Sequence, residues 1–253
     1  MSFASDTYYM FLRWMKKLVR NPILLFFSLF QPIIFLVLFT QLFSSFGLLL
    51  GGNYTLFATA GIVLQNAFSS AFQSGTAIVD DIKSGFLTKI LATPASRSSI
   101  LLGRLLSDAF RVFAQSLIIL LLAYGLGVFP ATGIFGYILI LITVAFFGLA
   151  WSGISLALGL RTKSAETVFG IAGTLTFPLL FMSSALMKPD LMPKWMQTVS
   201  SYNPISFAVN AIRDLIMTGY VWSSFSQAYG VISLISVITL GATLYEFKKV
   251  VSE

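Results

Sequence analysis

The sequence contains no cysteine and no histidine among its 253 residues. These absences exclude disulfides, metal sites built on thiolate or imidazole, and nucleophile pairs of the Ser–His or Cys–His kind. Charged residues are also scarce. They make up 10% of the chain, whereas a soluble domain of this length carries about a quarter. We therefore expect a chain that is not an enzyme and that binds no metal or cofactor of its own.

The nucleotide-binding P-loop is missing as well. That motif needs Gly-Lys followed by Ser or Thr, because the lysine reaches the phosphates from a glycine-rich turn, and none of the 19 glycines is followed by lysine. Ion-coupled carriers usually place carboxylates inside their spans. Here the relevant acidic residues fall at or near the ends of apolar runs: Asp80, Asp81, Asp108, Glu166 and Glu246. We expect no internal energy source of either kind, so uphill transport would need a partner.

Apolar residues, by contrast, make up 57% of the chain, and the mean hydropathy is +0.89. These values predict an all-α integral membrane protein with one membrane domain over residues 1–253. A helix needs about 20 predominantly apolar residues to cross the hydrocarbon. Six runs of roughly that length are present, at residues 23–46, 56–79, 105–128, 134–160, 166–187 and 226–246.

The basic residues predict how these runs are oriented, because cytosolic loops of membrane proteins are enriched in Lys and Arg. With the N-terminus inside, twelve of the sixteen Lys and Arg residues fall in cytosolic segments and three fall in outer segments. The remaining one, Arg111, lies one to two turns inside the third run, and we expect its side chain to snorkel back to the surface. We predict a multi-pass protein of a prokaryotic plasma (inner) membrane with both termini in the cytosol.

Residues 1–21 are predicted to form a helix that lies in the headgroup plane. Its basic residues are Arg13, Lys16, Lys17 and Arg20. They interleave with apolar residues and Trp14, a pattern typical of interfacial helices. The alternative is a short disordered anchor.

The longest polar break between apolar runs, residues 80–104, is predicted to be cytosolic. Its basic residues are Lys83, Lys89, Arg97 and Arg104. Gly85 permits a turn before a short helix, and Pro94 ends that helix. The apolar face of the helix consists of Phe86, Leu87, Ile90 and Leu91. Thr88 and Lys89 lie opposite. Such a helix either inserts into a groove of a partner or lies on the lipid surface, and its residues leave both open.

The longest outer segment, residues 188–225, is predicted to contain short helices at about 191–201 and 205–217. Their apolar and aromatic residues indicate that they dip into the edge of the outer leaflet. The segment is marked by Pro193, Trp195, Asn203, Pro204 and Arg213. We expect Arg213 to be a surface or interfacial anchor, with a gate in the path as the alternative.

A polar stripe marks the second apolar run. Its members are Asn66, Ser69, Ser70 and Gln73. Their i, i+3, i+4, i+7 spacing puts them on one face of a helix. They either line a translocation path or form hydrogen bonds between neighbouring helices.

Small residues form a ridge on the fourth run. The ridge consists of Gly148, Ser152, Ser155 and Gly159. Small residues let helix backbones approach closely in membranes, so the ridge predicts tight helix packing. In the fifth run, Pro178 predicts a kink, with a hinge as the alternative.

Three groups of motifs resemble type-2 ATP-binding-cassette (ABC) exporter permeases, most closely their daunorubicin-resistance-type drug-efflux branch. The first group is Arg20-Asn21-Pro22 and Gln31-Pro32-Ile33-Ile34-Phe35. The second is Asp81, Ser84-Gly85, Pro94, Arg97, Gly103-Arg104 and Asp108. The third is Met192-Pro193-Lys194-Trp195-Met196-Gln197, Asn203-Pro204-Ile205 and Arg213. The likeness covers nearly the whole chain. One departure is Thr88-Lys89, where that branch often has Asp-Arg.

The resemblance implies a permease subunit that moves hydrophobic or amphipathic molecules, drug-like or lipid, out of the cytosol or inner leaflet. Such permeases pair with a second permease copy, here expected to form a homodimer. They bind a separate cytosolic ATPase, which holds ATP and magnesium. The short helix, about 85–93, would be a coupling helix seated in that ATPase, and the N-terminal helix would contact it too. The outer short helices would re-enter the membrane and cap the path.

The same resemblance assigns residues to the coupling role. They are Asp81, Gly85, Phe86, Leu87, Lys89, Ile90, Leu91, Pro94 and Arg97. An exporter of polysaccharide or lipid-linked glycan stays open as an alternative, as does a membrane scaffold that transports nothing. An intramembrane enzyme is disfavoured, because histidine, cysteine and pairs of carboxylates within the spans are missing.

Overall fold

The computed structural model of the chain describes residues 3–43 and 54–252, and these form helices joined by short connections. The α-helices are α1 (Phe3–Val19), α2 (Pro22–Leu42), α3 (Tyr54–Lys83), α4 (Phe86–Leu91), α5 (Arg97–Gly125), α6 (Gly133–Thr162), α7 (Ala165–Phe181), α8 (Lys194–Tyr202), α9 (Pro204–Met217) and α10 (Trp222–Ser252). A 3₁₀ turn, η2, covers Pro189–Leu191. Within the described ranges no strand occurs, which confirms the predicted all-α fold class.

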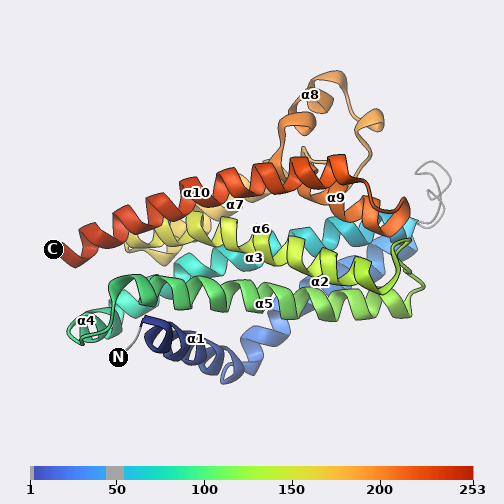
Figure 1. Cartoon of the computed structure of the whole chain (residues 1–253). Helices are drawn as coiled ribbons and strands as arrows, with labels where there is room; N and C mark the ends of the chain where they lie inside the picture. The colour runs from blue at the N-terminus through green and yellow to red at the C-terminus, as the bar shows by residue number, and fades with distance from the viewer. Residues whose placement is uncertain (1–2, 44–53, 253) are drawn as a thin grey trace.

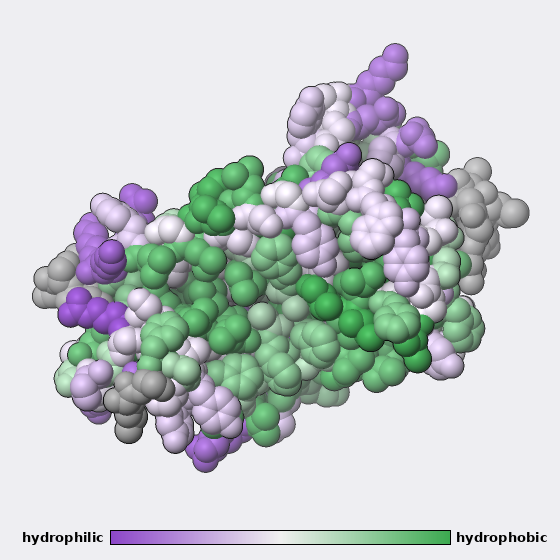
Figure 2. All heavy atoms as spheres, viewed as in Figure 1, coloured by the Kyte–Doolittle hydropathy of each residue, from purple (hydrophilic) through white to green (hydrophobic). Residues whose placement is uncertain are grey.

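The long helices run side by side along one axis (Figure 1). The start of α1, the short helix α4 and the end of α10 lie at one end of this bundle, and α8 and α9 lie toward the other. Figure 2 shows a broad apolar surface across the middle, with hydrophilic residues gathered at both ends. This distribution is that of a bundle whose middle faces hydrocarbon and whose ends face water.

Four of the described helices are long and apolar enough to cross a membrane: α2, α5, α6 and α10. The predicted run 56–79 lies in α3, which is long but is not among these four. The predicted run 166–187 lies in α7, which is apolar but ends at Phe181 after 17 residues. The last residues of the predicted run 23–46 lie outside the described residues. Six membrane-spanning helices were predicted. By length and composition alone, four of the described helices qualify.

The polarity of α3 has a physical explanation in its position. Most of its residues are buried within the bundle, including polar ones such as Thr59, Asn66 and Ser74. By contrast, only 17% of the apolar stretch of α2 is buried. A helix that is covered by protein does not need a lipid-compatible surface, so its sequence can carry more hydroxyl and amide groups.

The core of the bundle lies between α3 and α6. Phe147 and Trp151 stack with ring centroids 4.6 Å apart, and Phe68 of α3 lies 5.2 Å from Trp151. The predicted small-residue ridge of α6 is entirely buried: Gly148, Ser152, Ser155 and Gly159. It lets α6 approach its neighbours closely, which confirms the predicted packing role.

The closest approach in this core is at Gly75 of α3. Its backbone N–H donates to the Ser155 hydroxyl at 2.8 Å, and that hydroxyl donates to the carbonyl of Phe72 at 2.7 Å. A Cβ on Gly75 would collide with the backbone carbonyl of Ser155, and one on Gly159 would collide with the carbonyl of Gly75. The two helices are therefore in backbone-to-backbone contact here.

The N-terminal segment is helical from Phe3 to Val19, so the alternative of a disordered anchor is wrong for the described residues. The helix packs on α5, where a Cβ on Gly103 would lie 2.8 Å from the carbonyl oxygen of Thr7. Trp14 is buried beneath it, whereas Tyr8 and Tyr9 are exposed. Its predicted location in the headgroup plane stays a prediction.

The backbone contact at Gly75 gives a stability prediction. We expect Gly75→Ala to lower the stability of the purified protein by about 1–3 kcal/mol, because the added methyl group must push α3 away from α6. A thermal melt in detergent micelles measures this. Gly170→Ala in α7 is the control, because a Cβ there meets no atom within 4 Å. Equal melting temperatures for the two variants would contradict the close contact.

Candidate functional site

The connection between α3 and α5 is shorter than the predicted segment 80–104. Helix α3 continues to Lys83, and α5 begins at Arg97, capped by the Ser96 side chain, which accepts from the backbone N–H of Ser99. A helix of 30 residues spans about 45 Å, whereas the hydrocarbon is about 30 Å thick. Helices of this length extend beyond it, so charged residues near their ends remain helical. Asp80, Asp81 and Arg104 therefore lie on helices.

Helix α4 occupies the centre of this connection, as predicted from Gly85 and Pro94. Gly85 adopts the left-handed conformation, with φ 68°, that the turn requires. The helix itself is shorter than the predicted 85–93, because it spans Phe86–Leu91.

The apolar face of α4 points into the protein, whereas the sequence had left open a partner's groove or the lipid surface. Leu87 and Ile90 are buried against Ile78, Ile100 and Phe247. Phe86 and Leu91 are partly buried against the same cluster. These side chains hold α4 on the ends of the long helices, and they are not free to enter another protein's groove.

The outward face of the connection is polar and basic. Its exposed residues are Lys83, Ser84, Thr88, Lys89, Ala92, Thr93, Pro94 and Arg97. Of the residues assigned to coupling, Lys89, Pro94 and Arg97 lie on this face. We call it the basic face of α4.

Asp81 is buried and does not belong to the basic face of α4. Its carboxylate accepts from Arg13 at 3.0 and 3.1 Å and from Lys17 at 3.3 Å. The Arg13 guanidinium also lies 3.4 Å from the ring centroid of Phe86. Asp81 thus joins α1, α3 and α4, and any part it has in coupling is indirect.

A second ionic cluster lies deeper, and the sequence interpretation did not identify it. Arg104, Asp108 and Arg111 of α5 are 3%, 2% and 7% exposed. Asp108 accepts from the hydroxyl of Ser74 and from Arg104 Nε at 3.0 Å, and it pairs with Arg111 at 3.2 Å. Arg111 also donates to the carbonyl of Ser70 at 2.6 Å. The expectation that Arg111 snorkels to the surface is therefore wrong, because its partners lie inside the bundle.

The spacing of these residues contained the missing signal. Arg104 and Asp108 are four residues apart, and Asp108 and Arg111 are three apart, so the three side chains share one face of α5. Arg104 was placed in the polar segment 80–104 and Asp108 in the following apolar run, so the helical spacing between them was overlooked.

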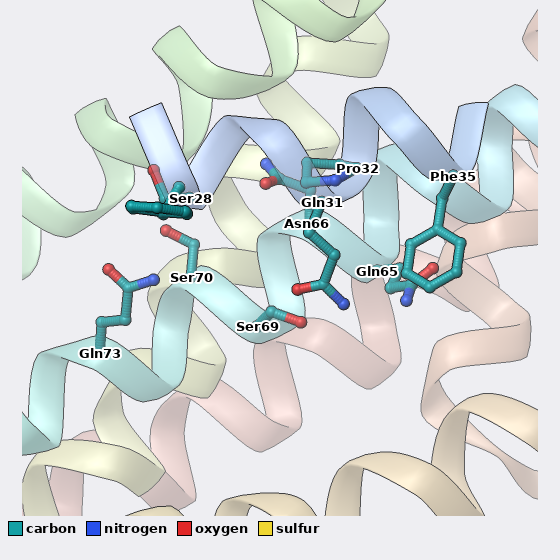
Figure 3. Close-up of a pocket in the computed structure, with 10 residues that line it drawn as sticks. Ser28, Gln31, Pro32, Phe35, Gln65, Asn66, Ser69, Ser70 and Gln73 are labelled. Atoms are coloured by element: carbon teal, nitrogen blue, oxygen red, sulfur yellow. The ribbon is translucent and has the colours of Figure 1, made fainter. Parts of the chain in front are cut away.

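The polar stripe of α3 lines a hollow of about 200 Å³ between α2 and α3 (Figure 3). The figure shows Asn66, Ser69, Ser70 and Gln73 along α3, with Ser28 and Gln31 of α2 across from them. Among the described residues, Asn66 Nδ2 and Ser70 Oγ are buried without a hydrogen-bond partner. These two groups therefore do not bond a neighbouring helix, and the translocation role of the stripe stays a prediction.

Two further hollows adjoin this one along α3. Toward the end that carries α8 and α9, a hollow of about 300 Å³ shares Gln65 and Ser69 with it and is lined mainly by apolar and aromatic side chains of α2, α3 and α7. Toward the α4 end, a hollow of about 350 Å³ shares Gln73 with it and includes Arg104 and Arg111 in its wall. The character of the lining thus changes along α3, from charged through polar to apolar.

The outer segment contains α8 and α9 near the predicted positions. Pro193 precedes α8, and Trp195 is 57% exposed. Pro204 is the first residue of α9, and Asn203 caps it. The Asn203 side chain accepts from the N–H of Ile205 at 2.9 Å and donates to the carbonyl of Leu179 at 2.7 Å. This cap fixes α9 against the end of α7.

Arg213 of α9 is partly buried, and its predicted role as an anchor or a gate stays a prediction. Its guanidinium lies 3.8 Å from the ring centroid of Phe57 and donates to the carbonyl of Ser184 at 2.7 Å. Burial lowers the pKa of Arg213 to about 9, so the side chain stays charged at neutral pH. It ties α9 to α3 and to the chain after α7.

The sequence matches known proteins over most of its length. The family described as "ABC-2 type transporter" matches residues 6–217. The daunorubicin resistance ABC transporter permease protein DrrB1 of Streptomyces coeruleorubidus is 31% identical over 204 residues, which cover 81% of this chain and 72% of that protein.

Two other relatives are similarly extensive matches. The putative transport permease ycf38 of Cyanophora paradoxa is 31% identical over 220 residues, covering 84% of this chain and 74% of that protein. The probable doxorubicin resistance ABC transporter permease protein DrrC of Mycobacterium tuberculosis is 22% identical over 225 residues, covering 87% and 80%. With the family matching most of the chain, this protein belongs to the ABC-2 type transporter family.

Proposed function

We propose that this chain is the permease subunit of an ATP-driven exporter, powered by a separate cytosolic ATPase that holds the ATP and magnesium. Membership of the ABC-2 type transporter family is the observation that carries this proposal. The sequence itself has no P-loop, so the energy must come from a partner. The hollows that follow one another along α3 supply a candidate path.

The topology we propose has six crossings, with α3 and α7 added to the four apolar helices, and both termini in the cytosol of a prokaryote. The start of α1 and the end of α10 lie at the same end of the bundle, which fits an even number of crossings (Figure 1). The basic face of α4 lies at that end too, as the enrichment of basic residues in cytosolic segments requires.

The basic face of α4 is the part we propose to contact the ATPase. It is exposed, it lies at one end of the bundle, and it includes Lys83, Lys89 and Arg97. Its fixed position comes from the buried Leu87 and Ile90 and from the Arg13–Phe86 contact. This fixed position suits coupling. A movement of the ATPase would displace α3 and α5 instead of only bending a flexible loop.

For the substrate, we propose hydrophobic or amphipathic molecules, either drug-like or lipid. The hollow toward the outer end is lined by Phe39, Phe72, Phe177 and other apolar side chains. Such a lining favours an apolar body over a polysaccharide, whose hydroxyl groups would lose hydrogen bonds with water there. The names of two relatives refer to daunorubicin and doxorubicin resistance.

We further propose that two copies form the transporter and that α8 and α9 cap the path on the outer side. Helix α7 buries few residues within the chain, and Phe169, Phe177 and Phe181 are more than half exposed on it. An apolar helix with this much free surface suits contact with a second copy or with lipid.

Charge reversal on the basic face of α4 tests the ATPase contact. We expect Lys89→Glu to reduce the amount of co-expressed ATPase that copurifies by about tenfold, because an interfacial charge pair would become a repulsion. Lys248→Glu is the control, since Lys248 is exposed near the end of α10, at the same end of the bundle. If both variants retain the ATPase equally, the basic face of α4 is not its docking surface.

Blocking the polar hollow tests the path. Ser69 borders both the polar and the apolar hollow, so we expect Ser69→Trp to lower the export rate of a drug such as daunorubicin by roughly tenfold without loss of the ATPase, because the indole fills the passage. Ser226→Trp, on the exposed side of α10, is the matched control. Export by Ser69→Trp at the control's rate, measured in inverted membrane vesicles, would rule out this path.

A further inference from the structure

The hollow nearest α4 has more positive than negative charge in its wall. The wall carries Lys17, Arg104 and Arg111 against Asp80 and Asp108. Of these five, Arg104, Asp108 and Arg111 are more than nine-tenths buried. Two guanidinium groups thus share one carboxylate, all three side chains being shielded from bulk water, and one buried positive charge is left without a counter-charge. Buried charge of this kind is costly unless it is paired.

The hydrogen bonds show where the deficit lies. Both oxygens of Asp108 are already engaged, by Ser74, Arg104 and Arg111. Arg111 uses its Nη2 on Ser70 and Asp108, but its Nε is buried without an acceptor among the described residues. An anionic oxygen in the hollow would supply the missing negative charge beside the two guanidinium groups.

The neighbouring ions do not remove this excess. Lys17 and Arg13 both pair with Asp81, which leaves one positive charge there as well. Asp80 is exposed at the edge of the hollow, whereas Arg111 lies deeper along α5. Arg104 and Arg111 are seven residues apart, or about 10 Å along the helix, so positive charge extends inward from the mouth.

The rest of the hollow has a different character. Trp14, Met15, Leu18 and Phe169 line it beside the charged groups. The volume of about 350 Å³ is roughly that of ten water molecules in the liquid. A phosphate or carboxylate group fits in that space together with the first part of an apolar chain.

We propose that Arg104 and Arg111 form a binding site for the acidic group, a phosphate or a carboxylate, of an amphipathic molecule. Trp14 and Phe169 would contact the adjoining apolar part. The same chemistry would recognise a phospholipid headgroup or an acidic substrate. The further idea that this site loads molecules into the path rests on the proposed export function, whereas the binding itself does not.

Binding can be measured on the purified full chain without any ATPase. Dodecyl phosphate is titrated into the protein in dodecyl maltoside micelles, with heat as the readout, and dodecyl trimethylammonium serves as the cationic counterpart. We expect saturable binding of the phosphate amphiphile only. Equal heats for the two amphiphiles would overturn the proposal.

A matched pair of variants isolates the role of charge. Ala77 lines the hollow and is partly exposed, so Ala77→Glu places a carboxylate in the hollow that the two arginines also line, and Ala77→Gln adds the same bulk without charge. We expect Ala77→Glu to weaken dodecyl phosphate binding by about tenfold or more, because it supplies the anion from within the chain, and Ala77→Gln to stay within about threefold of the native protein. Equal affinities for the two variants would overturn the proposal.

Arg111 variants provide the second arm. Arg111→Gln removes the excess charge, so we expect it to weaken dodecyl phosphate binding about tenfold. Arg111→Lys keeps the charge, so we expect it to retain most of the affinity for dodecyl phosphate. Arg111→Gln alters a buried network, so its melting temperature is compared with that of Arg111→Lys. If Arg111→Gln does not fold, the comparison of Ala77→Glu with Ala77→Gln tests the proposal instead.

Competition with inorganic phosphate distinguishes the two forms of the ligand. Displacement of dodecyl phosphate by inorganic phosphate, lost in Ala77→Glu, would show that the anion alone suffices. Displacement only by phosphatidylglycerol micelles would show that an apolar chain is needed. If the protein binds dodecyl phosphate but exports nothing in the presence of its ATPase, the binding site stands and the proposed transport role is refuted.

Discussion

The structure depends on the fact that polar groups inside a membrane bundle must find partners in the protein, because hydrocarbon offers none. Helix α3 carries more hydroxyl and amide groups than its neighbours, and it is the helix that the others cover. Its contact with α6 at Gly75 is close enough for the Ser155 hydroxyl to reach two backbone groups of α3. This contact holds α3 on one side only. On the side facing α2, the polar groups border hollows instead of packed side chains.

At the α4 end, two buried carboxylates organise the helices around α3. Asp81 draws Arg13 and Lys17 of α1 onto α3, and Asp108 draws α5 onto Ser74 of α3. Through Arg13 and Phe86, the first cluster also reaches α4. A force applied to the basic face of α4 would therefore pass to α1 and α3 through charged and aromatic contacts. This continuity relates the proposed docking surface to the proposed path, although the two share no residue.

The sequence was sufficient for the features that depend on local chemistry. The turn at Gly85, the short helices of the outer segment and the small-residue ridge of α6 all lie close to where their residues indicated. It failed where the outcome depends on what a helix packs against. Leu87 and Ile90 form an apolar face in either environment, and only the tertiary structure shows that this face is buried in a cluster that includes Ile78 of α3.

Arginines that bond inside the protein were the other source of error. Arg111 and Arg213 were assigned to surfaces because isolated arginines usually reach water. Each instead donates to a backbone carbonyl from another part of the chain, Ser70 of α3 for Arg111 and Ser184 after α7 for Arg213. A single sequence does not bring these groups together.

The order of the hollows along α3 bears on how an amphipathic molecule would travel. An acidic group held at Arg111 could not follow its apolar part into the outer hollow without losing that pairing, because the lining there is apolar and aromatic. The polar stripe between the two hollows, with Asn66 and Gln73, offers amide and hydroxyl partners to the acidic group. The free energy of placing that group there is therefore intermediate between the two hollows. Release from Arg111 is then the step that most needs outside energy. Asp108 and both arginines lie on α5, the helix that follows α4 in the chain. A shift of α5 driven from α4 would therefore move the three together relative to Ser70 and Ser74 of α3, with which they form hydrogen bonds.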